Sequence, residues 1–235
     1  MIDKPQGMTS FGVVARVRRV LSHRAGKKVK VGHCGTLDPF ATGLLILVTG
    51  KECRNAMRYT KLDKVYEATF RLGQTSTTGD PEGEIMPYVA NSKPQNDIQA
   101  SSISKQPDIA VVKSVLAQFV GDIKQRPPAF SAIKINGQRA YKLARSGKKV
   151  DIPERVVTIY ALELLDYAYP LLKVRAHVSS GTYIRSLAVD IGEALGTGAY
   201  CQELRRTQIA DMHIARRTRC KTGANLRICQ NLFPQ

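Results

Sequence analysis

The stretch GHCGTLDPFATGLLILVTG, residues 32–50, joins a glycine-rich turn to an apolar run and holds a single carboxylate, Asp38. Its glycines allow backbone conformations closed to other residues, and Pro39 fixes its own φ while favouring extended geometry at Asp38. The apolar run Leu44 to Val48 has the length of a strand. We therefore predict a rigid turn that presents Asp38 just before a strand. On geometry alone, an Asp38 that only bonds nearby amides, as in many Asp-Pro turns, is an equal alternative.

The composition favours a globular protein with a polyanionic partner. The 235 residues include 36 Lys and Arg against 19 Asp and Glu, which gives a formal net charge of +17. Such a charge repels itself in a compact state, and nucleic acid is the first candidate to neutralise it. With six Phe, nine Tyr and no Trp, we expect contacts to phosphates and shape rather than a broad stacking platform. An ordinary basic protein, or one that touches anionic lipid, is the alternative.

The cysteines and histidines indicate neither a disulfide framework nor a metal site. The five cysteines are odd in number and widely spaced: Cys34, Cys53, Cys201, Cys220 and Cys229. The histidines His23, His33, His177 and His213 show no i, i+4 pairing. We expect a reducing compartment, no metal and no cofactor.

No apolar run is long enough to span a membrane, and no leader precedes the first motif. A missing N-terminal extension would look the same. We therefore expect a cytoplasmic protein with no membrane partner, or an organellar one if an extension is missing.

Two helices and three strands can be predicted from periodicity. Thr9 or Ser10 can cap a helix over 10–21 whose apolar residues are Phe11, Val14, Val17 and Val20 or Leu21. A second helix fits 182–195, with Gly196 as its stop signal. Strands are predicted at 65–72, with Tyr66, Ala68, Phe70 and Leu72 on one face, at 156–165, and at 171–178 with Leu172, Val174, Ala176 and Val178 inward.

The order of these elements predicts the fold class. Strands dominate and helices are interspersed irregularly, without the regular β-α alternation of a doubly wound sheet. We predict an α+β fold with a mixed, largely antiparallel sheet. A short helix-compatible segment at 111–120 follows a polar stretch, 88–108, that we interpret as a surface insertion. Residues 124–149 hold eight Lys or Arg and no acid, and three turn signals indicate a basic arm.

Six motifs in order resemble those of the TruB-type tRNA pseudouridine synthases. They are DKPQGMTS at 3–10, GHCGTLDPFATGLL at 32–45, KVYEATFRLG at 64–73, RPPAFSAIKINGQRAYKLAR at 126–145, SSGTYIRSLAVDIGEALG at 179–196 and LRRTQIADM at 204–212. The resemblance implies a pseudouridine-synthase sheet flanked by helices, with a basic RNA-binding insertion. It also implies isomerisation of the T-loop uridine at position 55 of tRNA to pseudouridine.

By this resemblance Asp38 is the essential catalytic carboxylate. The reaction breaks the C1′ to N1 bond, rotates the base and reattaches it through C5, which needs a fixed nucleophile or charge stabiliser. Arg185 is expected to pair with Asp38, and Tyr66 to stack on the uracil and to be a candidate base for the C5 proton. Helix periodicity alone favours an ordinary exposed arginine at 185, and strand periodicity alone a core tyrosine at 66.

The resemblance also implies the residues that bind RNA. The target base must be flipped out of its loop, and His33 matches a histidine that fills the vacated space, although a lone loop histidine is more often a surface group. Lys4 is expected to support the pocket structurally, with a surface lysine as the alternative; Tyr183 and Leu204 match pocket-lining positions. The arm contributes Arg126, Lys134, Arg139, Lys142 and Arg145. The expected partner is the tRNA T stem-loop, bound by a monomer without metal.

The sequence departs from the family pattern in two places. Cys34 stands where relatives more commonly have Thr, Ala or Ser, and no base is visible that would make it a nucleophile. We expect a catalytic domain over 1–212 and a short basic tail over 213–235, too short for a complete C-terminal RNA-binding domain. The alternatives are a tRNA-binding or RNA-folding module with impaired catalysis and a guide-RNA-directed relative. A hydrolase is remote, because no motif places a second carboxylate.

Overall fold

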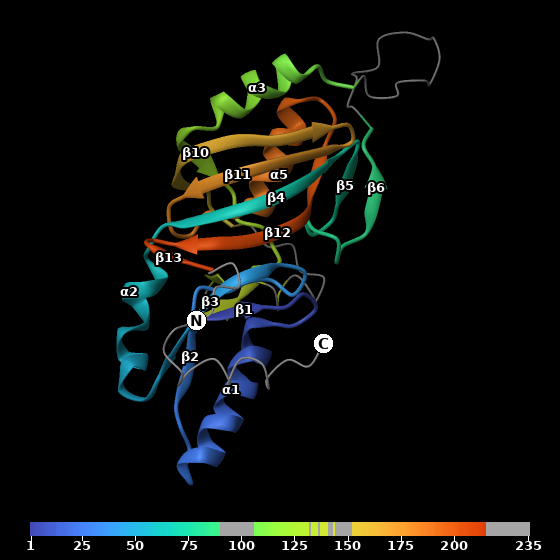
Figure 1. Cartoon of the computed structure of the whole chain (residues 1–235). Coiled ribbons are helices and arrows are strands. Elements are labelled where there is room, and N and C mark those ends of the chain that lie inside the picture. The colour runs from blue at the N-terminus through green and yellow to red at the C-terminus, as the bar shows by residue number, and fades with distance from the viewer. Residues whose placement is uncertain (90–105, 132, 136, 141–142, 144–151, 215–235) are drawn as a thin grey trace. The chain divides into compact units, whose positions relative to one another are not determined.

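The structure, a computed structural model, describes residues 1–89, 106–131, 133–135, 137–140, 143 and 152–214 (Figure 1). The chain divides into two compact units. Unit 1 consists of Met1–Val65 and Arg205–Gln235, and unit 2 of Tyr66–Leu204. Strands β4 (Lys64–Leu72) and β12 (Ala199–Ile209) each have residues in both units.

Unit 1 is organised around strand β3. The elements that lie entirely in this unit are β1 (Ile2–Lys4), α1 (Ser10–Ala25), β2 (Val31–Cys34), β3 (Thr42–Thr49), the 3-10 helix η1 (Gly50–Asn55), α2 (Ala56–Thr60) and β13 (Met212–His213). Strands β1 and β2 pair with β3 antiparallel, with Ile2 opposite Leu45 and Cys34 opposite Ile46. The end of β12 pairs with β3 in parallel, at Arg206 and Gly43.

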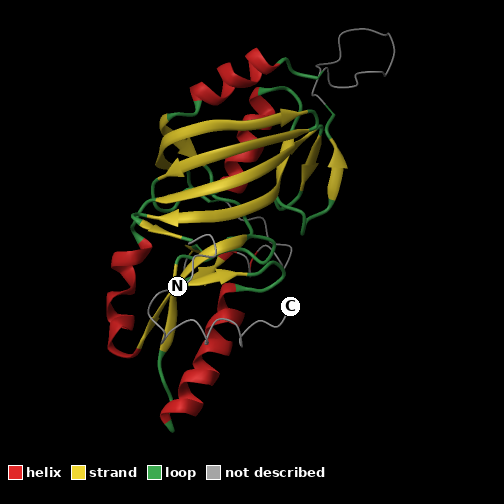
Figure 2. Ribbon diagram, viewed as in Figure 1, coloured by secondary structure: helices red, strands yellow, loops and turns green. Residues whose placement is uncertain are grey.

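Unit 2 is built on a sheet in the order β12, β4, β11, β10, β7 (Figure 2). Its further elements are β5 (Gln74–Ser76), β6 (Ile85–Pro87), α3 (Ile109–Gln118), β7 (Gly121–Gln125), β8 (Lys134–Ile135), β9 (Gln138–Arg139), β10 (Arg155–Ala168), β11 (Leu171–Val178) and α5 (Ile184–Ala194). Strand β10 is antiparallel to both β11 and β7. Helix α5 lies against one face of this sheet (Figure 1), and α3 contacts β10 and α5. The predicted mixed, largely antiparallel α+β class is confirmed.

Alternation of apolar residues builds the core of unit 2. On β11 the side chains of Leu172, Val174, Ala176 and Val178 are all buried, as the sequence predicts. Strand β4 likewise buries Tyr66, Ala68, Phe70 and Leu72, and α5 buries Leu187, Ala188 and Ile191. Burying each of the Val, Leu, Ile and Phe side chains among these stabilises the fold by about 1.5–3 kcal/mol.

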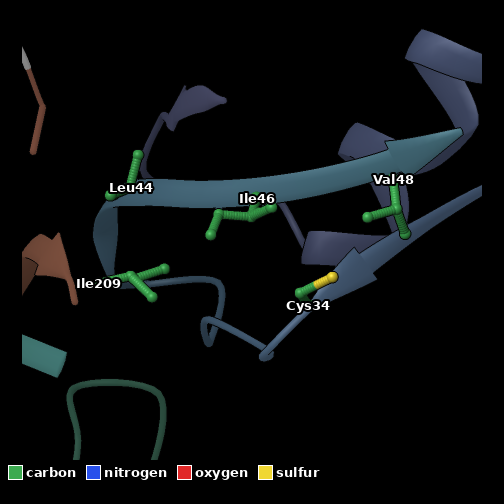
Figure 3. Packing of buried hydrophobic residues seen from close by; sticks show 5 residues of the cluster. All are labelled: Cys34, Leu44, Ile46, Val48 and Ile209. Carbon is green, nitrogen blue, oxygen red and sulfur yellow. The ribbon is translucent and has the colours of Figure 1, made fainter. Parts of the chain in front are cut away.

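Unit 1 has a separate small core at the edge of the Asp38 turn. Figure 3 shows Cys34 facing a row formed by Leu44, Ile46 and Val48 of β3, with Ile209 at its end. Cys34 is fully buried and packs as a small apolar side chain, and burial raises the pKa of its thiol. This packing agrees with the view that Cys34 is not a nucleophile, because a raised thiol pKa leaves little thiolate.

Helix α1 is one turn longer than predicted and buries a different stripe. Thr9 is its N-cap and accepts a hydrogen bond from Gly12 N at 2.9 Å; Gly26, at φ +61°, ends it. Phe11 is 64% exposed, whereas Val13 takes its expected place in the core. The prediction for Phe11 is therefore wrong. The helix faces the core with Val13, Val14 and Val17, and Phe11 lies outside this buried stripe.

Some sequence predictions fall outside the described residues. These include most of the 88–108 insertion, Lys142 and Arg145 of the arm, and the tail beyond residue 214. Lys124, placed at the start of the arm, lies in β7 and pairs with Val156. Among the helices that the structure describes, none is long and apolar enough to cross a membrane.

Candidate active site

The loop between β2 and β3 carries Asp38 and is tied to the start of α1. The Ser10 hydroxyl is buried; it accepts a hydrogen bond from Leu37 N at 2.8 Å and donates one to Leu37 O at 2.9 Å. Within the loop, Ala41 N donates to Asp38 O at 3.2 Å. The residue before Asp38 is thus fixed on both its amide and its carbonyl, which positions the partly buried Asp38 side chain.

Lys4 supports the same loop from β1. Its side chain is fully buried, and Nζ donates to the carbonyl oxygens of Pro5 at 2.9 Å, Met8 at 2.7 Å and Pro39 at 3.3 Å. The amide of Gly7 donates to the same Pro39 oxygen at 2.8 Å. Because a buried ammonium is costly without such acceptors, these bonds hold the N-terminal segment against Pro39, the neighbour of Asp38.

Arg206 is a third support, to which the sequence analysis assigned no role. It is 1% exposed; Nε donates to Leu44 O at 2.7 Å and Nη2 to Gly35 O at 3.1 Å. Gly43 has φ +106°, and a Cβ there would clash with the backbone of Arg206, lying 2.7 Å from its amide nitrogen. The close approach of the Arg206 backbone therefore requires glycine at position 43, whereas glycine at position 35 is favoured by its φ of +90°.

His33 lies on β2 just before the loop, opposite Leu47. Burial, and secondarily the positive charge of Arg206, hold the pKa of His33 below its ordinary value. A neutral imidazole results at physiological pH, and a neutral ring is desolvated at lower cost than a charged one. This state suits a side chain that is expected to stack against bases.

In unit 2 the guanidinium of Arg185 is buried in a cage of acceptors. It lies in the first turn of α5 and is 3% exposed; Nη1 contacts Asp80 Oδ2 and Thr78 O, each at 3.0 Å, and Nη2 donates to Phe130 O at 2.9 Å. Asp80 is itself buried and accepts from Thr78 Oγ1 at 2.6 Å and Glu82 N at 3.0 Å. Asp80 was missed because TTGDPEGE at 77–84 has the composition of an ordinary turn.

The start of α5 is clamped by a buried glutamine. The side chain of Gln125 accepts from Tyr183 N at 2.8 Å and donates to Tyr183 O at 3.0 Å, in place of a side-chain cap. The Tyr183 ring faces Arg155, whose guanidinium carbon lies 5.0 Å from the ring centroid. Together these contacts fix both the backbone and the ring of Tyr183, two residues before Arg185.

The structure distributes the predicted site residues over the two units. Unit 1 holds Lys4, His33 and Asp38, and unit 2 holds Tyr66, Arg126, Lys134, Arg139, Tyr183, Arg185 and Leu204. Tyr66 and Leu204 are buried, whereas Arg126 is exposed and pairs with Glu154 at 3.5 Å. The predicted pairing of Asp38 with Arg185, and the stacking role of Tyr66, stay predictions. In the part of the chain that the structure describes, no group of three His, Cys, Asp or Glu residues could hold a metal ion.

Comparison with solved structures defines the class of fold. The chain is similar to a chain of a Cbf5–Nop10–Gar1 complex, with a TM-score of 0.62 and 30% sequence identity over 88% of this chain and 47% of that one. A chain of an archaeal box H/ACA Nop10–Cbf5 complex matches with a TM-score of 0.58, 27% identity and coverage of 89% and 46%. The fold is thus similar to that of chains found in Cbf5–Nop10 complexes.

Comparison with sequence families is more specific. Residues 18–184 match the TruB family pseudouridylate synthase N-terminal domain, and residues 185–227 the tRNA pseudouridylate synthase B C-terminal domain. The chain belongs to the TruB family of pseudouridylate synthases.

Curated relatives named tRNA pseudouridine synthase B occur in several bacteria. The one from Dechloromonas aromatica is 44% identical over 214 residues, which cover 91% of this chain and 65% of the relative. The one from Bacteroides thetaiotaomicron is 43% identical over 217 residues, with 90% and 85% coverage. The chain spans about two thirds of the length of the first relative and under half of the matched Cbf5-complex chain.

Proposed function

We propose that this chain is an isomerase that converts the uridine at position 55 in the T loop of tRNA to pseudouridine. The proposal is supported by the family membership and by relatives named for this activity. The observation that carries it is the Asp38 loop, which Lys4, Ser10 and Arg206 hold at both ends through buried hydrogen bonds. A carboxylate fixed in this way costs little reorganisation when charge develops beside it.

In the proposed reaction the Asp38 carboxylate acts at the extruded nucleoside. The C1′ to N1 bond breaks, the uracil rotates, and C1′ bonds to C5; the proton on C5 is lost and N1 regains one, so composition does not change. Arg185 keeps Asp38 ionised and oriented, and Tyr66 stacks on the uracil and is placed to accept the C5 proton. The chemistry is proposed to need neither metal nor cofactor.

Binding is proposed to precede chemistry by extrusion of the target base. Flipping costs a few kcal/mol, and His33 fills the space that the base leaves. The arm residues Arg126, Lys134, Arg139, Lys142 and Arg145 would contact phosphates and 2′-hydroxyls of the T stem. The bacterial relatives support a cytoplasmic protein, and we propose that it acts as a monomer.

The test is to map pseudouridine in an unmodified tRNA transcript after incubation with the chain alone, in the presence of a chelator. We expect modification at position 55 only. Asp38→Asn should abolish turnover and largely preserve tRNA binding, because the amide keeps the shape of the side chain but not its charge. Wild-type turnover by this variant would refute the role of Asp38.

The same assay separates two other functions. A binding or RNA-folding module would bind tRNA without modifying it. A guide-directed enzyme would modify RNA only when a guide RNA and partner proteins are added, and the similarity to chains of Cbf5 complexes is the observation behind this alternative. The higher identity to tRNA pseudouridine synthase B, 44% over 91% of the chain, favours the stand-alone enzyme.

A further inference from the structure

Helix α1 leads away from the catalytic loop within unit 1. Ser10, its first residue, binds both backbone groups of Leu37, next to Asp38. The helix has 16 residues. At a rise of 1.5 Å per residue it is about 24 Å long. Side chains near its C-terminal end therefore lie about 20 Å along the axis from the loop that is proposed to hold the target nucleoside.

The segment that contains α1 is strongly and uniformly basic. Residues 4–37 include eight Lys or Arg and no Asp or Glu. Six of these cations are exposed: Arg16, Arg19, Arg24, Lys27, Lys28 and Lys30. We refer to Arg19, Arg24, Lys27, Lys28 and Lys30 as the α1 basic surface.

The α1 basic surface is held in place by the fold. The helix buries Val13, Val14 and Val17, so Arg19 lies on the opposite, solvent face. Beyond Gly26 the chain turns back, and the amide of Val29 donates to the Ser22 hydroxyl at 2.9 Å. This bond fastens the lysine-bearing loop to the last turns of the helix and keeps its charges close to those of the helix.

Helix capping does not explain this concentration of charge. Cations in a last turn complement the helix dipole by about 0.3–1 kcal/mol each, which accounts for Arg24. It does not account for Arg19, two turns from the end, or for the lysines beyond the helix. A cluster of like charges repels itself, so a free cluster costs stability unless a polyanion binds it.

Two other arginines that are at least partly exposed are each paired with carboxylates. Arg205, in the same unit, pairs with Asp3 at 2.6 Å, and Arg175 pairs with Glu67 at 2.9 Å and Glu163 at 3.2 Å. Among the described residues, no carboxylate pairs with any member of the α1 basic surface. The charge of this surface is available to an outside partner.

We propose that the α1 basic surface binds backbone phosphates of the tRNA that are remote from the target nucleoside. The inference rests on the proposed function for the identity of the RNA. With Asp38 at the extruded uridine, the helix would follow the RNA for about 20 Å and add sequence-independent phosphate contacts to those of the arm. An anionic membrane is a poorer match, because interfacial helices insert an apolar face, and here that face is buried in the core of unit 1.

The experiment compares two triple variants with equal loss of charge. Arg19→Gln/Lys27→Gln/Lys28→Gln removes three cations of the surface. Lys61→Gln/Lys113→Gln/Lys173→Gln removes three exposed cations elsewhere and is the matched control. Dissociation constants are measured against salt concentration for complete tRNA and for a minimal T-loop hairpin, and circular dichroism checks that all variants are folded.

For complete tRNA, the surface variant should show a slope of log Kd against log salt that is smaller by about 2, and a Kd about tenfold higher at 0.1 M salt. Its Kd for the minimal hairpin, and both Kd values of the control variant, should stay within about twofold of the wild type. An unchanged slope for tRNA would overturn the proposal. Equal weakening for the hairpin would also overturn it, because the surface would then bind at the target loop.

Two further outcomes distinguish this proposal from membrane binding and from the proposed enzymatic function. If wild-type protein binds phosphatidylserine vesicles, the surface variant does not, and both bind tRNA equally, the partner is a membrane and the proposal is overturned. If the wild-type protein makes no pseudouridine but the surface variant still loses its salt slope on tRNA alone, the proposed enzymatic function fails while this assignment stands.

Discussion

Asp80 is the acidic partner of the buried Arg185 guanidinium, and both side chains are almost inaccessible to water. Asp80→Asn removes the charge but keeps the shape, and the desolvated guanidinium of Arg185 loses its ion pair with the Asp80 carboxylate. We expect the free energy of unfolding to fall by about 3 kcal/mol, as found when one partner of a buried pair is removed. We also expect kcat to fall more than tRNA affinity, because the guanidinium is then less firmly oriented.

The exposed pair Arg126 and Glu154 is the matched control for this prediction. Their nitrogen and oxygen are 3.5 Å apart, and both side chains are at least half exposed. Glu154→Gln should change the free energy of unfolding by less than about 1 kcal/mol in the same denaturant titration. Equal effects of the two substitutions would mean that the Asp80 pair contributes no more than a surface ion pair.

Asp190 on α5 provides a test of pH dependence. Burial, and then the nearby Glu193 and Glu154, raise the pKa of Asp190 from 3.8 to about 6. A raised pKa in the folded state favours the neutral carboxyl, so stability present below pH 3.8 is lost as the pH rises toward 6. Asp190→Asn should therefore be about 1–2 kcal/mol more stable than wild type at pH 7.5, allowing for partial exposure, and equal to it near pH 3.8. Chemical denaturation at both pH values measures the difference.

At the scale of elements, the parallel pairing of β3 with β12 depends on Gly43. Gly43→Ala would place a methyl group against the backbone of Arg206 at φ +106°, so the two strands cannot keep their register. We expect a loss of at least about 3 kcal/mol and of activity, because Arg206 also holds the Asp38 loop. Gly50 at the other end of β3 is the control: at φ +57° it has open space, and Gly50→Ala should cost only about 1–2 kcal/mol. Urea unfolding of both variants, with the tRNA modification assay, tests this.

Elements with a strong local pattern were predictable, and elements defined by distant partners were not. The alternation of apolar residues in β11 predicts both the bounds and the buried face of this strand. Helix α1 ends at Gly26, a residue type that the sequence itself marks as a helix stop signal. The predicted basic arm begins at Lys124, inside strand β7, because GDIKQ at 121–125 has little apolar character that would indicate a strand. Its strand conformation comes from pairing with β10, which no local pattern contains.

The candidate catalytic positions can be predicted from motif resemblance, whereas the residues that support them cannot. Arg206 could have been found by strand parity: it lies two residues from the apolar Leu204, so both point inward, whereas Arg205 points outward to Asp3. Asp80 has no such signal, because its burial depends on Arg185, more than a hundred residues later in the chain. Residues that act through a distant partner need the fold before they can be identified.

At the scale of the whole molecule, the net charge of +17 should give salt two opposite effects. Raising sodium chloride from about 50 to 200 mM screens self-repulsion, and we expect the melting temperature to rise or stay constant. Over the same range the affinity for tRNA should fall by about two orders of magnitude or more. The reason is that the release of counterions from the RNA on binding is less favourable at higher salt. Differential scanning fluorimetry and filter binding on one protein sample measure both. If the melting temperature and the tRNA affinity both fell with salt, specific ion pairs rather than charge repulsion would determine how the stability of the fold depends on salt.

Arg206 joins the Asp38 loop only after the ribosome has made all of unit 2, since roughly 160 residues separate it from Gly43. At a synthesis rate of about 5–20 residues per second this is a delay of about 8 to 33 s. During that interval the nascent loop lacks one of its anchors. A chain that ends before residue 206 therefore has Asp38 in a loop without this anchor, and we expect it to lack the proposed activity.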